Sequence, residues 1–401
     1  MQVDSLPAPL RDLASRLWLW RVASARSRTI RPMDAPQAYA SGRDSIRMLV
    51  VGSGPAAGWG VGSHDLALPG ALARAMAATT GRGVVVDVLA GADIGVRTLR
   101  STLADADLSR YAAIVVSVTM TDALHRADPV RWEGRMRSAL DHIRSRSQGV
   151  VVWLGSQPIR SVRPYDNEYG DIVQRSATDL NRRAAAVCAD TDLAVFVPLA
   201  APPHNDSARH RTPADYLFWA RQIADVIAPD VADVISPIPP APAEDRVDAI
   251  ARLRLHERGP DARLDGIVGT ARRTLQSDIA LFSVLDDEKQ WHLASSGTQL
   301  TEFPLEESVC VYTIATDDGM VIPNAEEDPR FAENDMVTGP AHLRFYAGYP
   351  VEAPDGTRIG AICVFGRTAR DPAESETDLD VLRELALLAQ RELWRWEPGE
   401  Q

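Results

Sequence analysis

Aspartate and histidine side chains gather on loops that the sequence places at one end of a predicted sheet. Five of them are Asp122, His125, His204, Asp206 and His210. Imidazole and carboxylate groups can hold a zinc ion or move protons in catalysis. Their spacings match no metal motif that we can name, and loop tips are commonly polar because they face solvent. We therefore expect neither a metal ion nor a bound cofactor.

The three cysteines offer a second kind of chemistry. Cys188, Cys310 and Cys363 lie far apart in apolar segments and form no CxxC pair. This spacing indicates neither a zinc site nor a disulfide framework, and it favours buried core sulfur in a reducing compartment. No apolar run approaches the roughly 20 residues that span a bilayer. The sequence therefore predicts a cytoplasmic protein.

Composition limits the partners of the chain. Its 401 residues are 45% hydrophobic and 24% charged, as is ordinary for a globular protein. This length is enough for two domains with separate cores. The formal net charge of -12 argues against nucleic acid as a partner, because phosphate binding needs a clustered basic face.

The first half of the chain must position most of these side chains. Near-continuous apolar runs, typical of buried parallel strands, occur at residues 46–51, 84–89, 113–118, 150–154 and 193–197. Helical patterns lie near residues 68–78, 96–103, 132–144, 173–188 and 213–227. This alternation predicts an α/β protein with a flavodoxin-like α/β/α sandwich over residues 46–230. Its site should lie beyond the carboxyl ends of the strands.

Two segments flank this predicted domain. Residues 1–45 carry a short apolar helical stripe around Leu17 and Trp18, followed by arginines. Such a helix could lie on an anionic membrane surface, but its short apolar face favours docking on the first domain. Residues 231–245 contain a proline-rich run, which indicates a stiff linker.

Residues 246–401 predict an α+β domain with an antiparallel sheet. Helices are expected at 249–257, 264–275 and 375–396, and strands at 279–286, 291–296, 320–322, 345–351 and 358–365. The Asp355-Gly356 pair predicts a hairpin turn between the last two strands. The final helix carries many large apolar residues, which predicts a homodimer through this helix.

This second half resembles the GAF family. The resemblance rests on ordered motifs at residues 279–286 (IALFSVLD), 290–291 (QW), 308–310 (SVC), 321–324 (VIPN), 328–332 (DPRFA), 344–348 (RFYAG), 355–356 (DG) and 359–364 (IGAICV). It implies a sensory domain with helices behind the sheet and a pocket for an unknown small molecule. Cys310, Arg344 and Tyr346 are the pocket candidates. The asparagine-lysine pair of cyclic-nucleotide relatives is missing, and Cys310 is not followed by the histidine typical of bilin carriers.

The first half looks like the SGNH (GDSL) hydrolase family, with altered catalytic positions. In active relatives the first strand runs into Gly-Asp-Ser; here Ser53 stands at the aspartate position and Gly54 at that of the nucleophile. Gly91 matches the second-block glycine of the oxyanion hole, and Thr121 replaces the oxyanion asparagine. His210 keeps the catalytic histidine position, but its aspartate is replaced by Ser207.

Three altered catalytic positions favour a pseudoenzyme. Loss of one oxyanion donor lowers the rate by roughly 10²–10³, and loss of the nucleophile or orienting acid by about 10⁴ or more. We therefore interpret the chain as a sensory or regulatory protein that joins a GAF domain to a hydrolase-like domain without activity. The alternative is a GAF-regulated acyl or carbohydrate esterase with a non-standard nucleophile such as Ser53. A hydrogen bond between Ser53 and His210 would favour that alternative.

Overall fold

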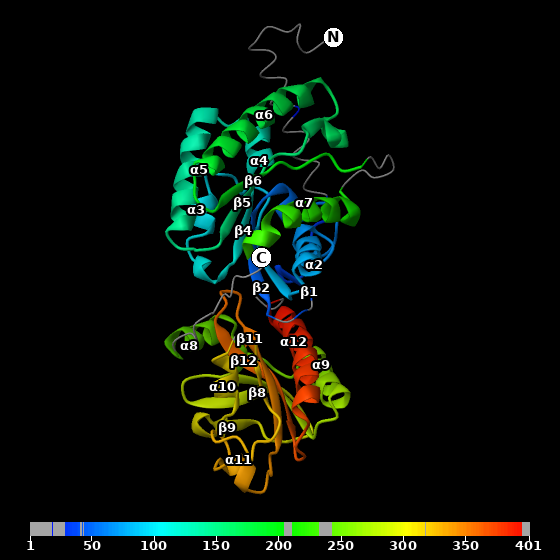
Figure 1. Cartoon of the computed structure of the whole chain (residues 1–401), viewed down its shortest axis with the longest axis vertical. Coiled ribbons are helices and arrows are strands. Elements are labelled where there is room, and N and C mark those ends of the chain that lie inside the picture. The colour runs from blue at the N-terminus through cyan, green and yellow to red at the C-terminus, as the bar shows by residue number, and fades with distance from the viewer. Residues whose placement is uncertain are drawn as a thin grey trace. The chain divides into compact units, whose positions relative to one another are not determined.

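The computed structural model describes residues 18, 29–40, 42, 44–203, 211–231, 243–316 and 318–394. The chain separates into two compact units that divide between Ser236 and Pro237. This division falls inside the proline-rich segment of residues 231–245. Each unit has its own sheet and its own core (Figure 1).

The sheet of the N-terminal unit has the strand order β1-β3-β2-β4-β5-β6. Its strands are β1 (Gln37–Ala40), β2 (Ile46–Gly52), β3 (Val84–Ala90), β4 (Ala113–Ser117), β5 (Val150–Leu154) and β6 (Ala194–Val197). Strands β2 to β6 pair in parallel, and β1 adds an antiparallel edge beside β3. The five predicted strands are present in this sheet, and β1 is an addition to them.

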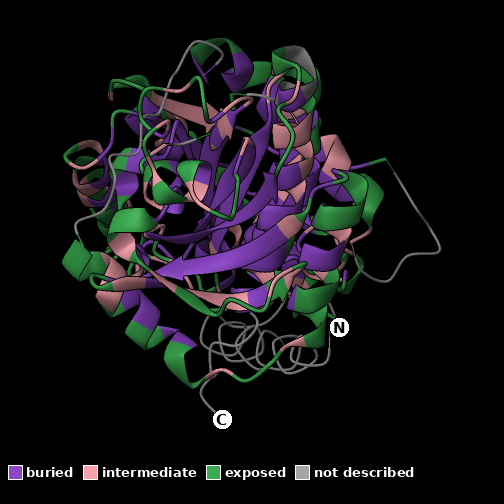
Figure 2. Ribbon diagram, turned by 90° about the horizontal axis from the view of Figure 1, so that it is seen from below, coloured by how far each residue is buried: buried purple, intermediate pink, exposed green. Residues whose placement is uncertain are grey.

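Helices cover both faces of this sheet, which confirms the predicted α/β/α sandwich. The helices are α2 (Leu68–Thr80), α3 (Leu99–Thr102), α4 (Thr119–Leu124), α5 (Pro129–Arg144), α6 (Glu168–Ala189) and α7 (Pro213–Val231). Alternate residues of β2 point to opposite faces. Met48 therefore joins the core under α2 and α7, and Leu49 joins the core under α5 and α6. In both units the strands are mostly buried, and exposed residues lie mainly on helices and loops (Figure 2).

Side-chain caps set the starts of the longer helices. The Asp128 carboxylate accepts a hydrogen bond from the Arg131 amide, and Pro129 occupies the first turn of α5. The Asn167 side chain accepts from the amides of Tyr169 and Gly170 at the start of α6. Helix α6 therefore begins several residues before the predicted start at residue 173, because its polar first turn follows a good capping residue.

The N-terminal unit includes residues before position 46. Strand β1 pairs along its length with β3. Asp34 accepts a hydrogen bond from the His64 amide at 3.0 Å and lies 2.7 Å from His64 Nδ1, so it ties this segment to the loop before α2. Trp18 stacks on Tyr169, with ring centroids 5.3 Å apart. This contact agrees with a segment docked on the first domain, although most of residues 1–28 lie outside the described part of the chain.

The sheet of the C-terminal unit is antiparallel throughout, as predicted. Its strand order is β10-β11-β12-β7-β8-β9. The strands are β7 (Ile279–Leu285), β8 (Lys289–Ser296), β9 (Glu302–Pro304), β10 (Met320–Ile322), β11 (Phe345–Glu352) and β12 (Arg358–Gly366). Gly356 has a φ of 88° in the turn between β11 and β12, a conformation that favours glycine.

Helices lie on both sides of this antiparallel sheet (Figure 1). They are α8 (Ala243–Arg252), α9 (Ala262–Thr274), α10 (Cys310–Ile314), α11 (Asp335–Thr338) and α12 (Pro372–Trp394). Helices α9 and α12 contact each other and cover one face. The other face packs its side chains against α10, α11 and the loops around them in one apolar cluster.

The apolar stripe of α12 is covered within its own unit. Leu382, Leu385, Leu393 and Trp394 are buried, whereas Leu388 is 40% exposed. The predicted homodimer was motivated by a bare stripe on this helix, and the described residues of α12 do not present one. Homodimerisation stays a prediction. Among the described residues, no helix combines the length and the apolar character that crossing a bilayer requires.

Candidate functional site

Ser53 lies where β2 meets the short helical turn η2 (Gly54–Ala57). Its side chain is buried, and its Oγ lies 2.7 Å from both the Ile94 carbonyl oxygen and Thr121 Oγ1. A carbonyl oxygen can only accept, so the Ser53 hydroxyl proton points to Ile94 and the Thr121 hydroxyl completes the pair. A nucleophilic serine needs a base that takes this proton. The carbonyl of Ile94 cannot be that base.

Gly54 and Gly91 occupy the positions at which the family resemblance predicts the nucleophile and an oxyanion donor. Gly54 has a φ of 62°, and a β-carbon placed on it would meet no atom within 4 Å. The nucleophile position therefore faces open space but holds no side chain. The amide of Gly91 donates to the Gly52 carbonyl at 2.9 Å. An oxyanion donor must point at the substrate oxygen, whereas this N–H completes the end of the sheet.

Asp122 is a buried carboxylate on α4, next to Thr121. Its Oδ2 accepts hydrogen bonds from the Val96 amide at 3.0 Å and from Trp132 Nε1 at 2.8 Å. Burial raises the pKa of Asp122, and these two donors oppose the shift only in part. Asp122 thereby fastens the loop after β3 to α5, which is a structural role.

Of the three predicted histidines, His125 alone belongs to the described residues. His125 is exposed, and its Nδ1 lies 2.9 Å from the Thr121 carbonyl on its own helix. His204, Asp206 and His210 lie outside the described residues, so the hydrogen bond between Ser53 and His210 stays a prediction of the esterase alternative. Among the described residues, no three His, Cys, Asp or Glu side chains cluster in a way that could hold a metal ion.

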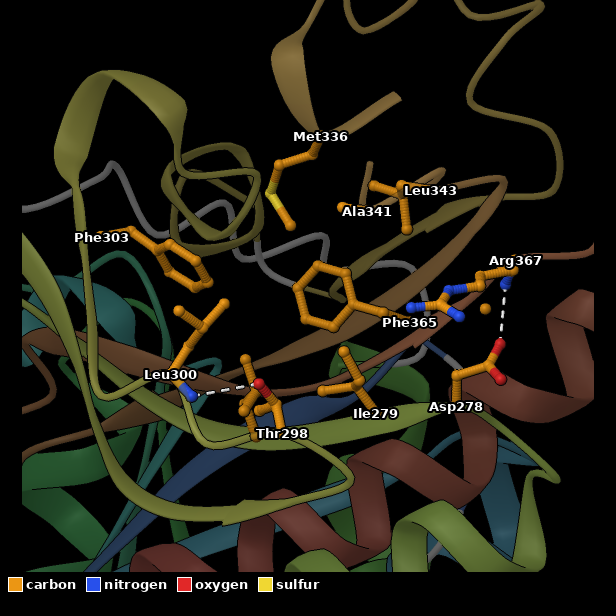
Figure 3. Close-up of a pocket in the computed structure, with 12 residues that line it drawn as sticks. Asp278, Ile279, Thr298, Leu300, Phe303, Met336, Ala341, Leu343, Phe365 and Arg367 are labelled. Carbon is orange, nitrogen blue, oxygen red and sulfur yellow. Dashed lines mark hydrogen bonds between the residues drawn. The ribbon is translucent and has the colours of Figure 1, made fainter. Parts of the chain in front are cut away.

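The C-terminal unit contains an apolar hollow at one end of its sheet (Figure 3). The hollow has about 480 Å³ of empty space, including the part that is open to solvent. Its walls come from the first residues of β7, the last of β12, the loop between β8 and β9, and the segment around α11. The lining residues are Asp278, Ile279, Leu281, Thr298, Leu300, Phe303, Met336, Ala341, Leu343, Phe365, Gly366 and Arg367.

Charged groups lie only at the rim of this hollow. The Asp278 carboxylate accepts a hydrogen bond from the Arg367 amide at 2.8 Å, which joins the start of β7 to the end of β12 (Figure 3). Arg367 is exposed, and its guanidinium has no hydrogen-bond or ion-pair partner among the described residues. The hollow therefore combines an apolar interior with an available cation at its mouth.

The three predicted pocket residues lie elsewhere in the C-terminal unit. Cys310 and Tyr346 are fully buried, and the Tyr346 hydroxyl lies 3.5 Å from Cys310 Sγ. Arg344 donates to the carbonyls of Val337 and Leu343, so it fastens the segment after α11. None of the three lines the hollow. Sequence reasoning missed the hollow, although two large apolar residues in a polar segment, Leu300 in the loop and Phe303 in β9, were an available signal.

A comparison with known protein families gives a match in the C-terminal unit. Residues 259–393 match the family model for the GAF domain. The chain is 36% identical over 152 residues to a cyclic di-GMP phosphodiesterase of Pseudomonas aeruginosa. The matched segment covers 37% of this chain and 26% of that protein. The chain thus spans about a quarter of the length of this curated relative.

Solved structures similar to each part of the chain are also found. The carbohydrate acetylesterase Est24 of Sinorhizobium meliloti covers 46% of this chain and 99% of its own, with 13% identity and a TM-score of 0.37. The GAF domain of an Acinetobacter phosphoenolpyruvate-protein phosphotransferase covers 37% of this chain and 92% of its own, with 18% identity and a TM-score of 0.27.

Proposed function

We propose that this chain, in which residues 259–393 form a GAF domain, is a sensory protein that binds a small apolar molecule carrying an anionic group. The apolar part of the ligand occupies the hollow at the end of the antiparallel sheet, and its anionic group faces Arg367. The N-terminal SGNH-like unit serves this protein without ester hydrolysis, as a binding or regulatory domain.

The hollow is the observation that carries this proposal. Ligand sites are concave and mostly apolar, with a few polar groups that fix orientation. The walls supplied by Leu281, Leu300, Phe303 and Phe365 fit an alkyl or aryl group, which gains about 0.8 kcal/mol for each buried methylene. Arg367 is exposed, so its attraction for an anion is worth about 0.2–1 kcal/mol.

The arrangement around Ser53 supports a role without hydrolysis. Its hydroxyl proton is held by the Ile94 carbonyl, and the Gly91 amide is bonded to Gly52. Position 54 has no side chain that could attack an ester. These three features argue against attack by Ser53, against attack from position 54 and against oxyanion binding by the Gly91 amide.

A head-group series on the full-length protein tests the ligand class. Octanoate, octanol and octylamine share one chain and differ in charge, and each is titrated while the unfolding temperature is followed. We expect the affinity order octanoate, octanol, octylamine, with steps of about two- to fivefold set by Arg367. Each methylene between hexanoate and octanoate should add about fourfold, as long as it is buried.

Two leucine variants locate the binding. Leu300→Asp places a charge at the mouth of the hollow and should abolish octanoate binding. Leu388→Asp is the matched control, because Leu388 on α12 is 40% exposed, against 54% for Leu300, and does not line the hollow. Arg367→Gln should make octanoate and octanol bind equally. Equal binding by both leucine variants, or no binding by the wild type, would refute the proposed site.

A further inference from the structure

Two of the three cysteines meet in the core of the C-terminal unit. Cys310 begins α10 and Cys363 lies in the middle of β12, yet their Sγ atoms are only 3.5 Å apart. Both side chains are fully buried. A disulfide needs the two sulfur atoms about 2.05 Å apart, so a small shift of side chains would suffice to join them.

Hydrogen-bonding groups surround this thiol pair. The Tyr346 hydroxyl lies 3.5 Å from Cys310 Sγ, and the Ser283 hydroxyl lies 3.8 Å from Cys363 Sγ. The Cys363 thiol, and then the Tyr346 hydroxyl, lower the pKa of Cys310 against the effect of burial. Burial raises the pKa of Cys363. Because the Tyr346 hydroxyl donates to Cys310 Sγ and stabilises a thiolate there, Cys310 is the sulfur assigned to the first attack.

The thiol pair lies directly behind the wall of the hollow. Leu281 lines the hollow and is the cross-strand partner of Cys363 between β7 and β12. Phe365 also lines the hollow, two residues from Cys363 on the same strand face, and its ring packs edge-on against Tyr346 at 5.2 Å. One layer of side chains thus separates an apolar guest in the hollow from Cys310 and Cys363.

We infer that Cys310 and Cys363 form an oxidation site whose substrate is an apolar organic hydroperoxide admitted through the hollow. The apolar lining selects an alkyl or aryl hydroperoxide over a fully hydrated oxidant. Only this entry route rests on the proposed ligand site. The reactivity of the pair rests on the geometry of the two thiols.

The reaction balances with the two thiols as the reductant. The Cys310 thiolate attacks the terminal oxygen of the hydroperoxide, so that an S–O bond forms and the O–O bond breaks. The leaving alkoxide takes the proton that Cys310 released and becomes an alcohol. The Cys363 sulfur then attacks the Cys310 sulfenic acid, and the displaced hydroxide leaves as water with the Cys363 proton. Two electrons pass from the thiols to the peroxide.

Cys188 provides an internal reference for this chemistry. It lies in the N-terminal unit, where burial raises its pKa to about 12. A thiol with so high a pKa holds almost no thiolate at neutral pH and reacts slowly with peroxides. The matched control variant Cys188→Ser should therefore oxidise at the same rate as the wild type.

The test exposes the reduced full-length protein to cumene hydroperoxide or hydrogen peroxide. The protein is then denatured, its free thiols are alkylated, and its peptides are mapped by mass spectrometry. We expect a Cys310–Cys363 link, a mass lower by about 2 Da, and one alkylated cysteine, Cys188. In Cys363→Ser, dimedone should trap a sulfenic acid on Cys310. Three alkylated cysteines in the treated wild type, or a link that involves Cys188, would overturn the inference.

The Leu300→Asp variant tests the entry route. It should slow oxidation by cumene hydroperoxide at least threefold and leave the rate with hydrogen peroxide unchanged. Equal rates with cumene hydroperoxide in this variant and the wild type would overturn the organic substrate class. A wild type that fails to bind octanoate, yet forms the link with cumene hydroperoxide, would refute the proposed function and keep the thiol site.

Discussion

The Ser53 region and the hollow of the GAF domain use their strand ends in opposite ways. Around Ser53, hydroxyl, carbonyl and amide groups bond to one another, so the polar groups at these strand ends are already satisfied. At the start of β7 and the end of β12 the walls are apolar, and the guanidinium of Arg367 is exposed. The comparison teaches that reactive residue types alone do not mark a site. In this chain the polar groups around Ser53 bond to one another, whereas Arg367 keeps an exposed guanidinium beside an apolar hollow.

Ser53→Ala should give the largest effect on the N-terminal side of this comparison. It leaves the buried Thr121 hydroxyl and the partly buried Ile94 carbonyl without their partner, which costs about 1–3 kcal/mol of unfolding free energy. Urea denaturation measures this loss. Ser101→Ala is the control, because Ser101 is exposed and the change should stay within about 0.5 kcal/mol. If Ser53 were instead a nucleophile, its replacement would abolish ester hydrolysis with little loss of stability.

Gly54→Ser should have a smaller effect and should not create an esterase. A serine there has room, but the positive φ costs about 1–2 kcal/mol for a residue with a β-carbon. Hydrolysis of nitrophenyl acetate should not rise above the wild-type rate, because the Gly91 amide stays bonded to Gly52 and Thr121 holds the asparagine position. A clear gain in turnover would break the comparison, since it would mean that the strand ends still support catalysis.

The pH dependence at Asp122 is the smallest and most specific expectation. Its folded pKa lies above the unfolded value of about 3.9, so the folded state binds the proton more tightly. Its contribution to stability is present below the unfolded pKa and is lost as pH rises through the folded pKa. The wild type should therefore lose stability relative to Asp122→Asn as the pH rises above about 4. Parallel unfolding curves across this range would contradict the assignment.

The fold was largely predictable because its strands and helices follow local patterns. The β-branched run of residues 150–154 became β5 with the same bounds, and residues 320–322 became β10. Strand β1 was missed because Gln37-Ala-Tyr-Ala40 has little strand propensity of its own. It is a strand because it completes the open edge of β3. A local sequence pattern does not indicate strands that form through tertiary pairing of this kind.

The sites were less predictable because they depend on contacts between distant segments. Ser53 donates its hydroxyl proton to the Ile94 carbonyl, which lies in the loop after β3, far from Ser53 in sequence. The hollow joins Ile279, Phe303 and Phe365 from three parts of the chain. Cys310 and Cys363 were interpreted as isolated core sulfur, and only the pairing of β12 with its neighbours brings them together. Residue type and order indicate each family resemblance, but they do not give these distances.

The pairing of β7 with β12 has a consequence for synthesis of the protein. These two strands are central in the antiparallel sheet, and Ile279 pairs with Phe365 although most of the domain lies between them in sequence. During translation β7 leaves the ribosome long before its partner exists, and its unpaired edge can join other chains. Long-range pairing of this kind also slows folding. A chain released before Gly366 would lack the centre of its sheet, and we expect it to depend on chaperones or be degraded.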